Sequence, residues 1–272
     1  MVSLRAAGES HLPWAFGMVS LVADWRVGKN PLSEIQLLPL VVSRGEIAFD
    51  VGANRGLYSY WLLRLGAQVF AFEPNPAMGR VLASRFAKDL KSGRMKLFEC
   101  VVSDDNGVVE LHIPVGFSPL ATVDGRAIAA DVPVDKLMIR AVRLDSFVEG
   151  PVDFIKIDVE GHEQKVLDGA AGLIASSRPT LLVEAEERHR PEAVASMRAM
   201  LEPLGYEGFF ALADGLHPIE TFDRARHQNI GALNAAGTAA REPFGYINNF
   251  LFIARPSVKE RFQGWTPRRL LG

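Results

Sequence analysis

Cysteine is nearly absent from this sequence. Cys100 is the only cysteine in the 272 residues, so an internal disulfide is excluded and nothing suggests a zinc site built on thiolates. Cys100 lies within the apolar run Leu97–Val102, and we therefore interpret it as a thiol of the hydrophobic core.

An excess of charge of one sign is also lacking. The formal net charge is −2, which provides no overall attraction to nucleic acid. The basic residues near the end of the chain are more simply explained as a solvated tail; they are Lys259, Arg261, Arg268 and Arg269. We therefore expect no nucleic-acid partner.

The sequence contains no apolar run long enough for a membrane-spanning helix. The apolar stretch Leu12–Val22 is bracketed by His11 and Asp24, and it is too short to span a bilayer. A signal peptide is a minor alternative, because no convincing small-residue cleavage site follows this stretch. We predict no membrane span and a cytoplasmic location.

The length is sufficient for a full hydrophobic core, and one elaborated domain is favoured over two independent domains. Proline and glycine interrupt residues 1–44, which indicates an N-terminal extension of short helices. We expect the main domain over residues 45–256 and a basic tail over residues 257–272.

Apolar strands alternate with amphipathic helices through the main domain. The predicted buried strands begin with Glu46–Asp50 and continue with Gln68–Phe72, Met95–Val102, Val152–Asp158, Thr180–Val183, Tyr206–Leu212 and Tyr246–Ile253. Val108–Ile113 and Met138–Leu144 alternate like strands, and we interpret them as a β-rich insertion before the fourth core strand. The order predicts an α/β fold with a doubly wound, mostly parallel, seven-stranded sheet and an antiparallel edge.

The stretch Asp50–Gly56 predicts a ligand-binding turn between the first strand and the helix that begins at Leu57. Gly52 and Gly56 permit positive φ and close backbone approach, and Asn54 is one of the few other residues that enter the left-handed region readily. The pattern Asp-x-Gly-x-Asn-x-Gly differs from the Gly-x-Gly-x-x-Gly of dinucleotide sites. It favours a nucleoside ligand without a pyrophosphate.

Acidic side chains end several of the predicted strands at the edge where such sheets bind ligands. Glu73 follows Asp50 by 23 residues, close to the spacing at which an acid on the second strand accepts hydrogen bonds from ribose hydroxyls. We favour this interpretation over a solvated strand end. Asp104, or Ser103 beside it, would lie where an adenine amino group could be recognised, although a turn-forming role is nearly as well supported.

A second dense polar patch follows the fourth core strand. Asp158, Glu160, His162 and Glu163 cluster at a strand-to-helix turn, where they could bind a substrate hydroxyl and remove its proton. Glu160 and Glu163 could instead only favour the positive end of the next helix, and an exposed, inactive His162 is an equal alternative. This donor set could hold magnesium, but nothing in the spacing requires a metal.

Lys156 lies inside the same strand and needs a partner if it is buried. Asp50 or Glu184 on flanking strands could provide one, which would make Lys156 structural. Glu184 and Glu186 alternate at the end of the fifth strand and so point to the same side. We expect one of them, Glu184, to face the substrate and the other to be solvated.

With these residues in place, the chain resembles the FkbM family of S-adenosylmethionine-dependent methyltransferases. The resemblance extends from about residue 44 to residue 186, and Asn248-Asn249-Phe250 is a weaker late match. The blocks that carry it are Asp50–Ser59, Phe72–Pro76, Arg143–Phe147 and Lys156–Glu163.

The resemblance implies a class I methyltransferase fold, S-adenosylmethionine as the methyl donor, and O-methylation of a hydroxyl on a sugar or natural product. Asp50, Gly52 and Asn54 would border the methionine part of the cofactor, Glu73 the ribose, and Ser103 or Asp104 the adenine. The full set predicted to bind the cofactor is Asp50, Gly52, Asn54, Gly56, Glu73, Ser103, Asp104 and Asp158. The predicted catalytic residues are Asp158, Glu160 and His162, and the predicted acceptor contacts are Glu163 and Glu184.

Two other functions stay open from the residues alone: a nicotinamide-dependent oxidoreductase on the same fold, and a non-catalytic interaction module. The oxidoreductase needs a phosphate-binding loop that Asn54 and the missing third glycine disfavour. Residues 1–44 and the connection Asp223–Pro243 fall outside the resemblance, so we expect them to select the acceptor, a small molecule or glycan. The sequence leaves a homodimer open.

Overall fold

The computed structural model describes residues 24–115, 121–123, 132–147, 150–235, 237 and 240–267. The first half of the predicted N-terminal extension and the last part of the predicted tail lie outside the described residues, as does most of the predicted loop between residues 114 and 130. Within the described residues, no helix has the length and apolar character needed to cross a membrane.

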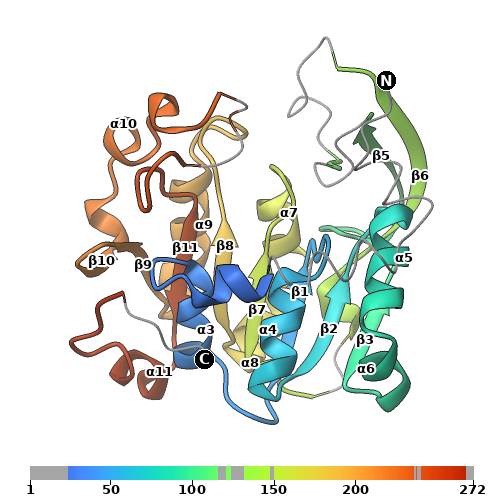
Figure 1. Cartoon of the computed structure of the whole chain (residues 1–272), viewed down its shortest axis with the longest axis horizontal. Helices are drawn as coiled ribbons and strands as arrows, with labels where there is room; N and C mark the ends of the chain where they lie inside the picture. Colours follow the sequence, from blue (N-terminus) through green and yellow to red (C-terminus); the bar gives the residue numbers. More distant parts are fainter. Residues whose placement is uncertain are drawn as a thin grey trace.

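A central sheet organises the molecule (Figure 1). Its strand order is β10-β9-β11-β8-β7-β1-β2-β3. The strands span Ile47–Val51 (β1), Gln68–Phe72 (β2), Met95–Phe98 (β3), Phe154–Ile157 (β7), Thr180–Glu184 (β8), Glu207–Leu212 (β9), Gly215–Pro218 (β10) and Asn249–Ile253 (β11). The pairs from β8 through β3 are parallel, whereas β11 runs antiparallel to both β8 and β9.

Helices cover both faces of this sheet, as predicted for a doubly wound fold (Figure 1). One face packs against α7 (Glu163–Asp168), α8 (Ala171–Ser177) and α9 (Ala193–Leu201). The other packs against α3 (Leu38–Val41), α4 (Leu57–Leu65), α5 (Pro76–Arg85) and α11 (Pro256–Glu260), and α6 (Ala87–Ser92) follows α5.

Alternation along β1 explains why both faces are covered. Phe49 and Val51 belong to the cluster with α7 to α9, whereas Ala48 belongs to the cluster with α3 and α4. Successive strand residues point to opposite faces, and every residue from Ala48 to Val51 is buried. This is the near-continuous apolar run expected of a strand with helices on both sides.

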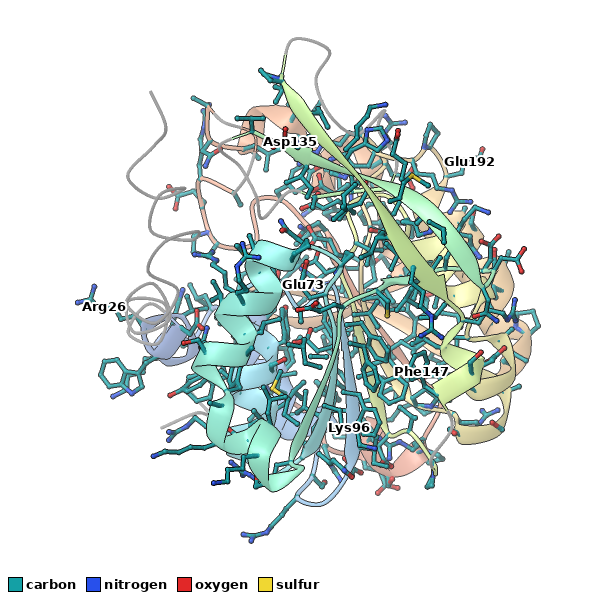
Figure 2. All side chains as sticks on the ribbon, turned by 90° about the vertical axis from the view of Figure 1, so that its right-hand side faces the viewer. Arg26, Glu73, Lys96, Asp135, Phe147 and Glu192 are labelled. Atoms are coloured by element: carbon teal, nitrogen blue, oxygen red, sulfur yellow. The ribbon has the colours of Figure 1, made fainter. Side chains whose placement is uncertain are left out.

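The predicted third strand is in fact two strands. Met95–Phe98 forms β3 of the central sheet, and Val101–Val102 forms β4 of a separate sheet with the order β4-β6-β5. The long strands of this second sheet, β5 (Gly107–Pro114) and β6 (Val134–Val142), lie where the β-rich insertion was predicted. Figure 2 shows them extending beyond the end of the central sheet that carries Glu73, with Asp135 near the outer end.

The strand count also differs from the prediction, because the described central sheet has eight strands and not seven. The additional strand is β10, which pairs with β9 through the tight connection after Leu212. Its sequence, Gly-Leu-His-Pro, is short and ends in a proline, so it has little of the apolar character on which strand prediction depends. Short helical segments complete this region: η4 (Leu144–Phe147), η5 (Glu202–Leu204), η6 (Ile219–Thr221), α10 (Arg224–His227) and η7 (Ile230–Ala232).

The turn after β1 requires glycine, which yields a first prediction. A Cβ at Gly52, whose φ is +78°, would lie 1.8 Å from the carbonyl oxygen of Asp158. Gly93 has nearly the same φ, +76°, but nothing lies within 4 Å of its Cβ position. We expect Gly93→Ala to cost about 1–2 kcal/mol of stability and Gly52→Ala to cost about 1–3 kcal/mol more from the steric conflict.

Urea denaturation of the two variants measures this difference in the free energy of unfolding. Equal losses for Gly52→Ala and Gly93→Ala would show that the contact between the turn and β7 is not tight.

Candidate active site

Two adjoining cavities open at the carboxyl ends of the central strands. The smaller has a volume of about 230 Å³ and the larger about 1120 Å³. Four residues line both of them: Thr122, Asp158, Glu160 and Glu184. Ligands bound in the two cavities would therefore meet at three carboxyl groups.

The smaller cavity is built on the turn that follows β1. Gly52 and Asn54 line it, and both have positive φ, +78° and +51°. Asn54 is thus in the left-handed conformation that its side chain tolerates better than most. This arrangement lets the backbone approach a ligand closely.

Glu73 lies at the carboxyl end of β2 and also lines the smaller cavity. One carboxyl oxygen accepts a hydrogen bond from the backbone N–H of Asn54 at 2.7 Å, and the other accepts one from Asn75 N–H at 2.8 Å. Burial raises the pKa of Glu73 to about 7 despite these two bonds. The carboxyl group is fixed in place, and each oxygen retains a lone pair for a ligand hydroxyl.

Two residues predicted to bind the cofactor lie behind the cavity and do not line it. Asp50 is buried and accepts hydrogen bonds from Ser59, at 2.9 Å from the backbone N–H and 2.6 Å from the hydroxyl. A Cβ at Gly56 would lie 2.5 Å from the ring of Phe86. Asp50 and Gly56 therefore hold β1 and α4 in register, so their part in ligand binding is indirect.

Ser103 and Asp104 also lie outside the lining of both cavities. Ser103 Oγ is 2.9 Å from Nε2 of His162 and donates a hydrogen bond to Asp104 at 3.0 Å. Asp104 pairs with Lys165 at 2.5 Å, and this bond lowers its pKa. His162 lines the smaller cavity but not the larger. The structure therefore places this predicted catalytic histidine away from the wall of the larger cavity.

Lys156 is the buried positive charge beneath the shared rim. It is 1% exposed, and its ammonium donates to Oδ1 of Asn249 at 3.2 Å and lies 3.6 Å from Oδ2 of Asp158. Burial alone would lower the pKa of Lys156, but the surrounding carboxylates, Asp158 foremost, raise it. The predicted partners, Asp50 and Glu184, act only through their charge, and the direct partners are Asn249 and Asp158.

Glu184 and Asp158 form a coupled pair of carboxyl groups on the rim. Burial and the negative charge of Asp158 raise the pKa of Glu184 well above its ordinary value, and the two groups are hydrogen-bonded to each other. The side-chain amide of Asn248 donates a further hydrogen bond to Glu184. Lys156 lies next to Asp158, so this pair of carboxyl groups borders a buried positive charge.

Glu160 and Glu163 follow Asp158 in the turn and have different positions. Glu160 lines both cavities, has a positive φ of +52°, and has a pKa raised to about 8 by burial and then by Asp158. Glu163 lines neither cavity; it accepts a hydrogen bond from Gly161 N–H at 2.9 Å. Glu163 therefore stabilises the turn, a position that differs from the predicted acceptor contact.

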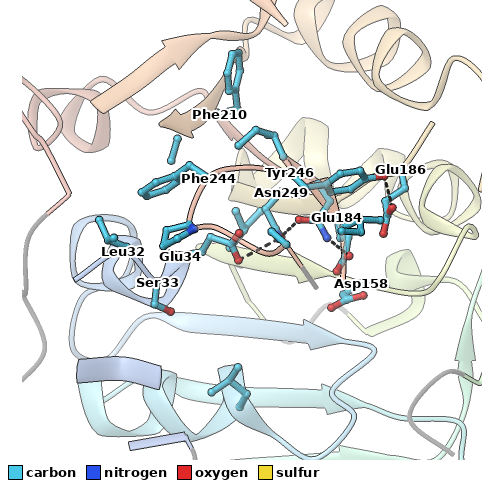
Figure 3. A pocket seen from close by; sticks show the side chains of 18 of the residues that line it. Leu32, Ser33, Glu34, Asp158, Glu184, Glu186, Phe210, Phe244, Tyr246 and Asn249 are labelled. Carbon is cyan, nitrogen blue, oxygen red and sulfur yellow. Dashed lines mark hydrogen bonds between the residues drawn. The ribbon is translucent and has the colours of Figure 1, made fainter. Parts of the chain in front are cut away.

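The larger cavity reaches from this rim toward the N-terminal segment and the loop before β11 (Figure 3). Glu186 is part of its wall but is 7% exposed, so the prediction that it would be solvated is wrong. Its carboxyl group accepts a hydrogen bond from the hydroxyl of Tyr246 at 2.6 Å and pairs with Arg188. Part of the predicted acceptor-selecting loop, Asp223–Pro243, also contributes to the wall.

Several lining residues were not among the predicted site residues. They are Glu34, Tyr58, Thr122, Arg188, Tyr246, Asn248 and Asn249. A usable signal was present only for Asn248 and Asn249, two adjacent amides at the start of a buried strand, where polar side chains need partners. The others come from segments whose position depends on contacts far apart in the chain.

The donor set of the smaller cavity fits a nucleoside cofactor. The turn that carries Gly52 and Asn54 lines the cavity together with the fixed carboxyl group of Glu73. Within the described residues, no group of three or more His, Cys, Asp or Glu side chains has the geometry to hold a metal ion.

Comparison with known proteins agrees with this geometry. The family model described as the methyltransferase FkbM domain matches residues 50–207. The chain is 29% identical over 156 residues to "31-O-demethyl-FK506 methyltransferase FkbM" of Streptomyces tacrolimicus, an alignment that covers 46% of this chain and 59% of that protein. It is 26% identical over 190 residues to "2-O-methyltransferase NoeI" of Sinorhizobium fredii, covering 62% of this chain and 75% of that protein.

A solved structure supports the fold. The crystal structure of methyltransferase FkbM from Methylobacillus flagellatus superposes with a TM-score of 0.50 at 18% identity, covering 78% of this chain and 44% of that chain. The predicted methyltransferase-like α/β fold with a mostly parallel sheet is thereby confirmed.

The raised carboxyl pKa values predict a pH dependence of stability in the absence of ligand. Burial raises the pKa of Asp50 to about 6 and that of Glu73 to about 7. These groups bind protons more tightly in the folded chain than in the unfolded chain, so their contribution to stability is full below about pH 4 and is lost as the pH rises to about 7.

We expect the unfolding midpoint to fall between pH 5 and 8 and to fall less in Glu73→Gln, which cannot titrate. Thermal unfolding across this range measures both slopes, with the exposed Glu110→Gln as the control. An unchanged slope in Glu73→Gln would contradict the assignment.

Proposed function

Because the chain belongs to the FkbM methyltransferase family, we propose that it catalyses S-adenosylmethionine-dependent O-methylation of a hydroxyl on a sugar or natural-product small molecule. One observation carries this proposal: two cavities, the smaller of them lined by Gly52, Asn54 and Glu73, meet at Asp158, Glu160 and Glu184. A methyl donor in one and an acceptor in the other would face each other at groups able to take a proton.

The cofactor is proposed to occupy the smaller cavity, with its ribose hydroxyls donating to Glu73. Gly52 and Asn54 would border the methionine part, because their turn leads from β1 toward the rim. His162, held by Ser103, would lie toward the adenine end. When bound, the cofactor supplies a methyl group already activated on a sulfonium.

The protein's own residues then have two tasks, alignment and proton removal. The acceptor hydroxyl would contact the Asp158–Glu184 pair from the side of the larger cavity, where Glu184 orients it and Asp158 accepts its proton. The ammonium of Lys156 lies 3.6 Å from Oδ2 of Asp158 and fixes the direction of that carboxyl group. The negative rim also favours a donor that carries positive charge.

The names of the two relatives support O-methylation, since one is a 2-O-methyltransferase and the other a 31-O-demethyl-FK506 methyltransferase. The chain spans 59% of the length of the first of these. The acceptor proposed for this chain is accordingly a class of hydroxylated molecule and not one compound.

The first test separates cofactor binding from chemistry. Glu73→Ala removes a charged acceptor of ribose hydrogen bonds, so we expect the affinity for S-adenosylhomocysteine to fall about tenfold to a hundredfold. Asp158→Asn should leave this affinity within a few-fold, because S-adenosylhomocysteine has no sulfonium, and should lower methyl transfer about 10²-fold or more. Isothermal titration and transfer of labelled methyl measure the two effects.

Absence of S-adenosylhomocysteine binding by the unaltered chain would end the proposal. Retained methyl transfer by Asp158→Asn would reject only the proton-accepting role of Asp158.

A second test concerns His162, for which the sequence left a catalytic base and an inactive, exposed residue as equal alternatives. Since His162 lines only the smaller cavity, we expect His162→Asn to raise the KM for S-adenosylmethionine and to leave kcat within a few-fold. Steady-state kinetics at saturating acceptor distinguishes the outcomes, and a large loss of kcat at unchanged KM would restore His162 as the base.

A further inference from the structure

The larger cavity changes in polarity along its length, and the strand order defines that length. Its wall follows the rim from β7 through β8, β11 and β9 to β10. Neighbouring strands lie about 4.8 Å apart, so these four steps cover about 19 Å. The cavity thus extends well beyond the point at which the two cavities meet.

The end near the cofactor cavity is acidic. Asp158 and Glu160 follow β7, and Glu184 ends β8. One strand farther, at β11, the lining becomes amide, with Asn248 and Asn249. These are groups that bind hydroxyls, as acceptors at the rim and as both donors and acceptors at the amides.

Apolar side chains gather toward the end farthest from the cofactor cavity, alongside Ser33, Arg241 and Glu242. Phe210 and Ala211 of β9 and Leu216 of β10 line it. Leu32 and Phe244, from the segments on either side of the opening, complete this wall. Figure 3 shows Leu32, Phe244 and Phe210 well separated from Asp158 and Glu184.

Packing in the hydrophobic core does not account for every apolar side chain of this wall. Phe210 is 1% exposed and packs against Phe222 and His227, so it would be apolar in any case. Leu32 is 36% exposed, however, and Leu216 and Phe244 are partly exposed. Phe244 also has a φ of +57°, which is unfavourable for a bulky residue.

The volume supports an extended ligand. At about 1120 Å³, the larger cavity exceeds the range of roughly 300–1,000 Å³ that is common for small-molecule sites. A compact, fully hydroxylated sugar at the rim would leave the apolar wall in contact with water, without a gain from its burial.

We propose that the acceptor is amphipathic: a hydroxyl-bearing head, such as a sugar, at the carboxylate rim and an apolar body or chain against Leu32, Leu216 and Phe244. This inference rests on the proposed function, since it takes the larger cavity as the acceptor site. A glycoside with an apolar aglycone has this chemistry, and a free polar sugar does not.

The test uses glucose and a series of alkyl β-glucosides from butyl to octyl, at concentrations below micelle formation, as probes. Each is titrated into the protein with and without saturating S-adenosylhomocysteine, after binding of S-adenosylhomocysteine itself has been measured. Affinity should rise about fourfold per added methylene while the chain is being buried. Glucose should bind weakly or not at all.

Variants of lining residues test whether the gain in affinity per methylene arises in the larger cavity. Phe244→Ala and Leu32→Ser, which lie on different segments, should each reduce the gain per methylene, and Leu32→Ser changes an exposed residue that the fold does not need. Ile230→Ser is the matched control, because Ile230 is 64% exposed and does not line the cavity. Glu184→Gln should weaken all glucosides by a similar factor and leave the gain per methylene unchanged.

An affinity independent of chain length, binding by no glucoside, or a gain that persists in both cavity variants would overturn the inference. If S-adenosylhomocysteine binds and the affinity does not change along the glucoside series, only the amphipathic acceptor is rejected. If S-adenosylhomocysteine does not bind at all, the proposed function fails first, whatever the glucosides do.

Discussion

The ammonium of Lys156 is the charge on which the rest of the site depends. Burying a lysine is costly, and it is tolerated only where charged and hydrogen-bonded partners surround the group. Lys156 has Asp158 and Asn249 as partners, and its position lies among Asp158, Glu184, Glu34 and Asp50, whose negative charges raise its pKa. This cation lies beneath the acidic rim and offsets part of its negative charge.

The same lysine connects parts of the wall that are far apart in the sequence. Asn249 accepts from Lys156 and donates to Glu34 at 3.1 Å, so the N-terminal segment, β11 and β7 share one hydrogen-bonded chain. Tyr58 lies over the ammonium at 5.0 Å from the ring centroid. The wall of the larger cavity is therefore fixed to β7, the strand that leads to the proposed proton acceptor, Asp158. Alignment of two reactants requires such a fixed geometry.

Local sequence patterns were sufficient to predict residues around the smaller cavity, the proposed cofactor site. They were insufficient to predict the residues around the larger cavity, the proposed acceptor site. Gly52, Asn54 and Glu73 could be placed because one strand, one turn and the next strand determine their positions. The partner of Lys156 could not be placed in this way. Asn249 is 93 residues away in the sequence, and strand order alone left Asp50 and Glu184 as equally plausible partners. The break between β3 and β4 was also hidden, because Glu99 is the only charged residue in Leu97–Val102 and a single charged residue does not show that two sheets share the segment. Asp50 and Gly56 show a related ambiguity. Both were predicted to bind the cofactor, but Asp50 bonds to Ser59 and Gly56 packs against Phe86. A sequence pattern does not separate a residue that the fold needs from one that contacts a ligand.

The polarity of the larger cavity follows from how the sheet is extended. Strands β2, β7 and β8 bring acidic residues to the rim near the smaller cavity, where a positively charged donor gains most from them. Strands β9 and β10 add an apolar edge. Its side chains lie too far from the positively charged donor to interact with it. An extension of the sheet by two strands therefore does more than lengthen the core: it adds a second recognition surface about 19 Å from the first. In this arrangement the cofactor end determines what reaction occurs, while the distance to the apolar end determines which hydroxyl of an elongated acceptor reaches Asp158.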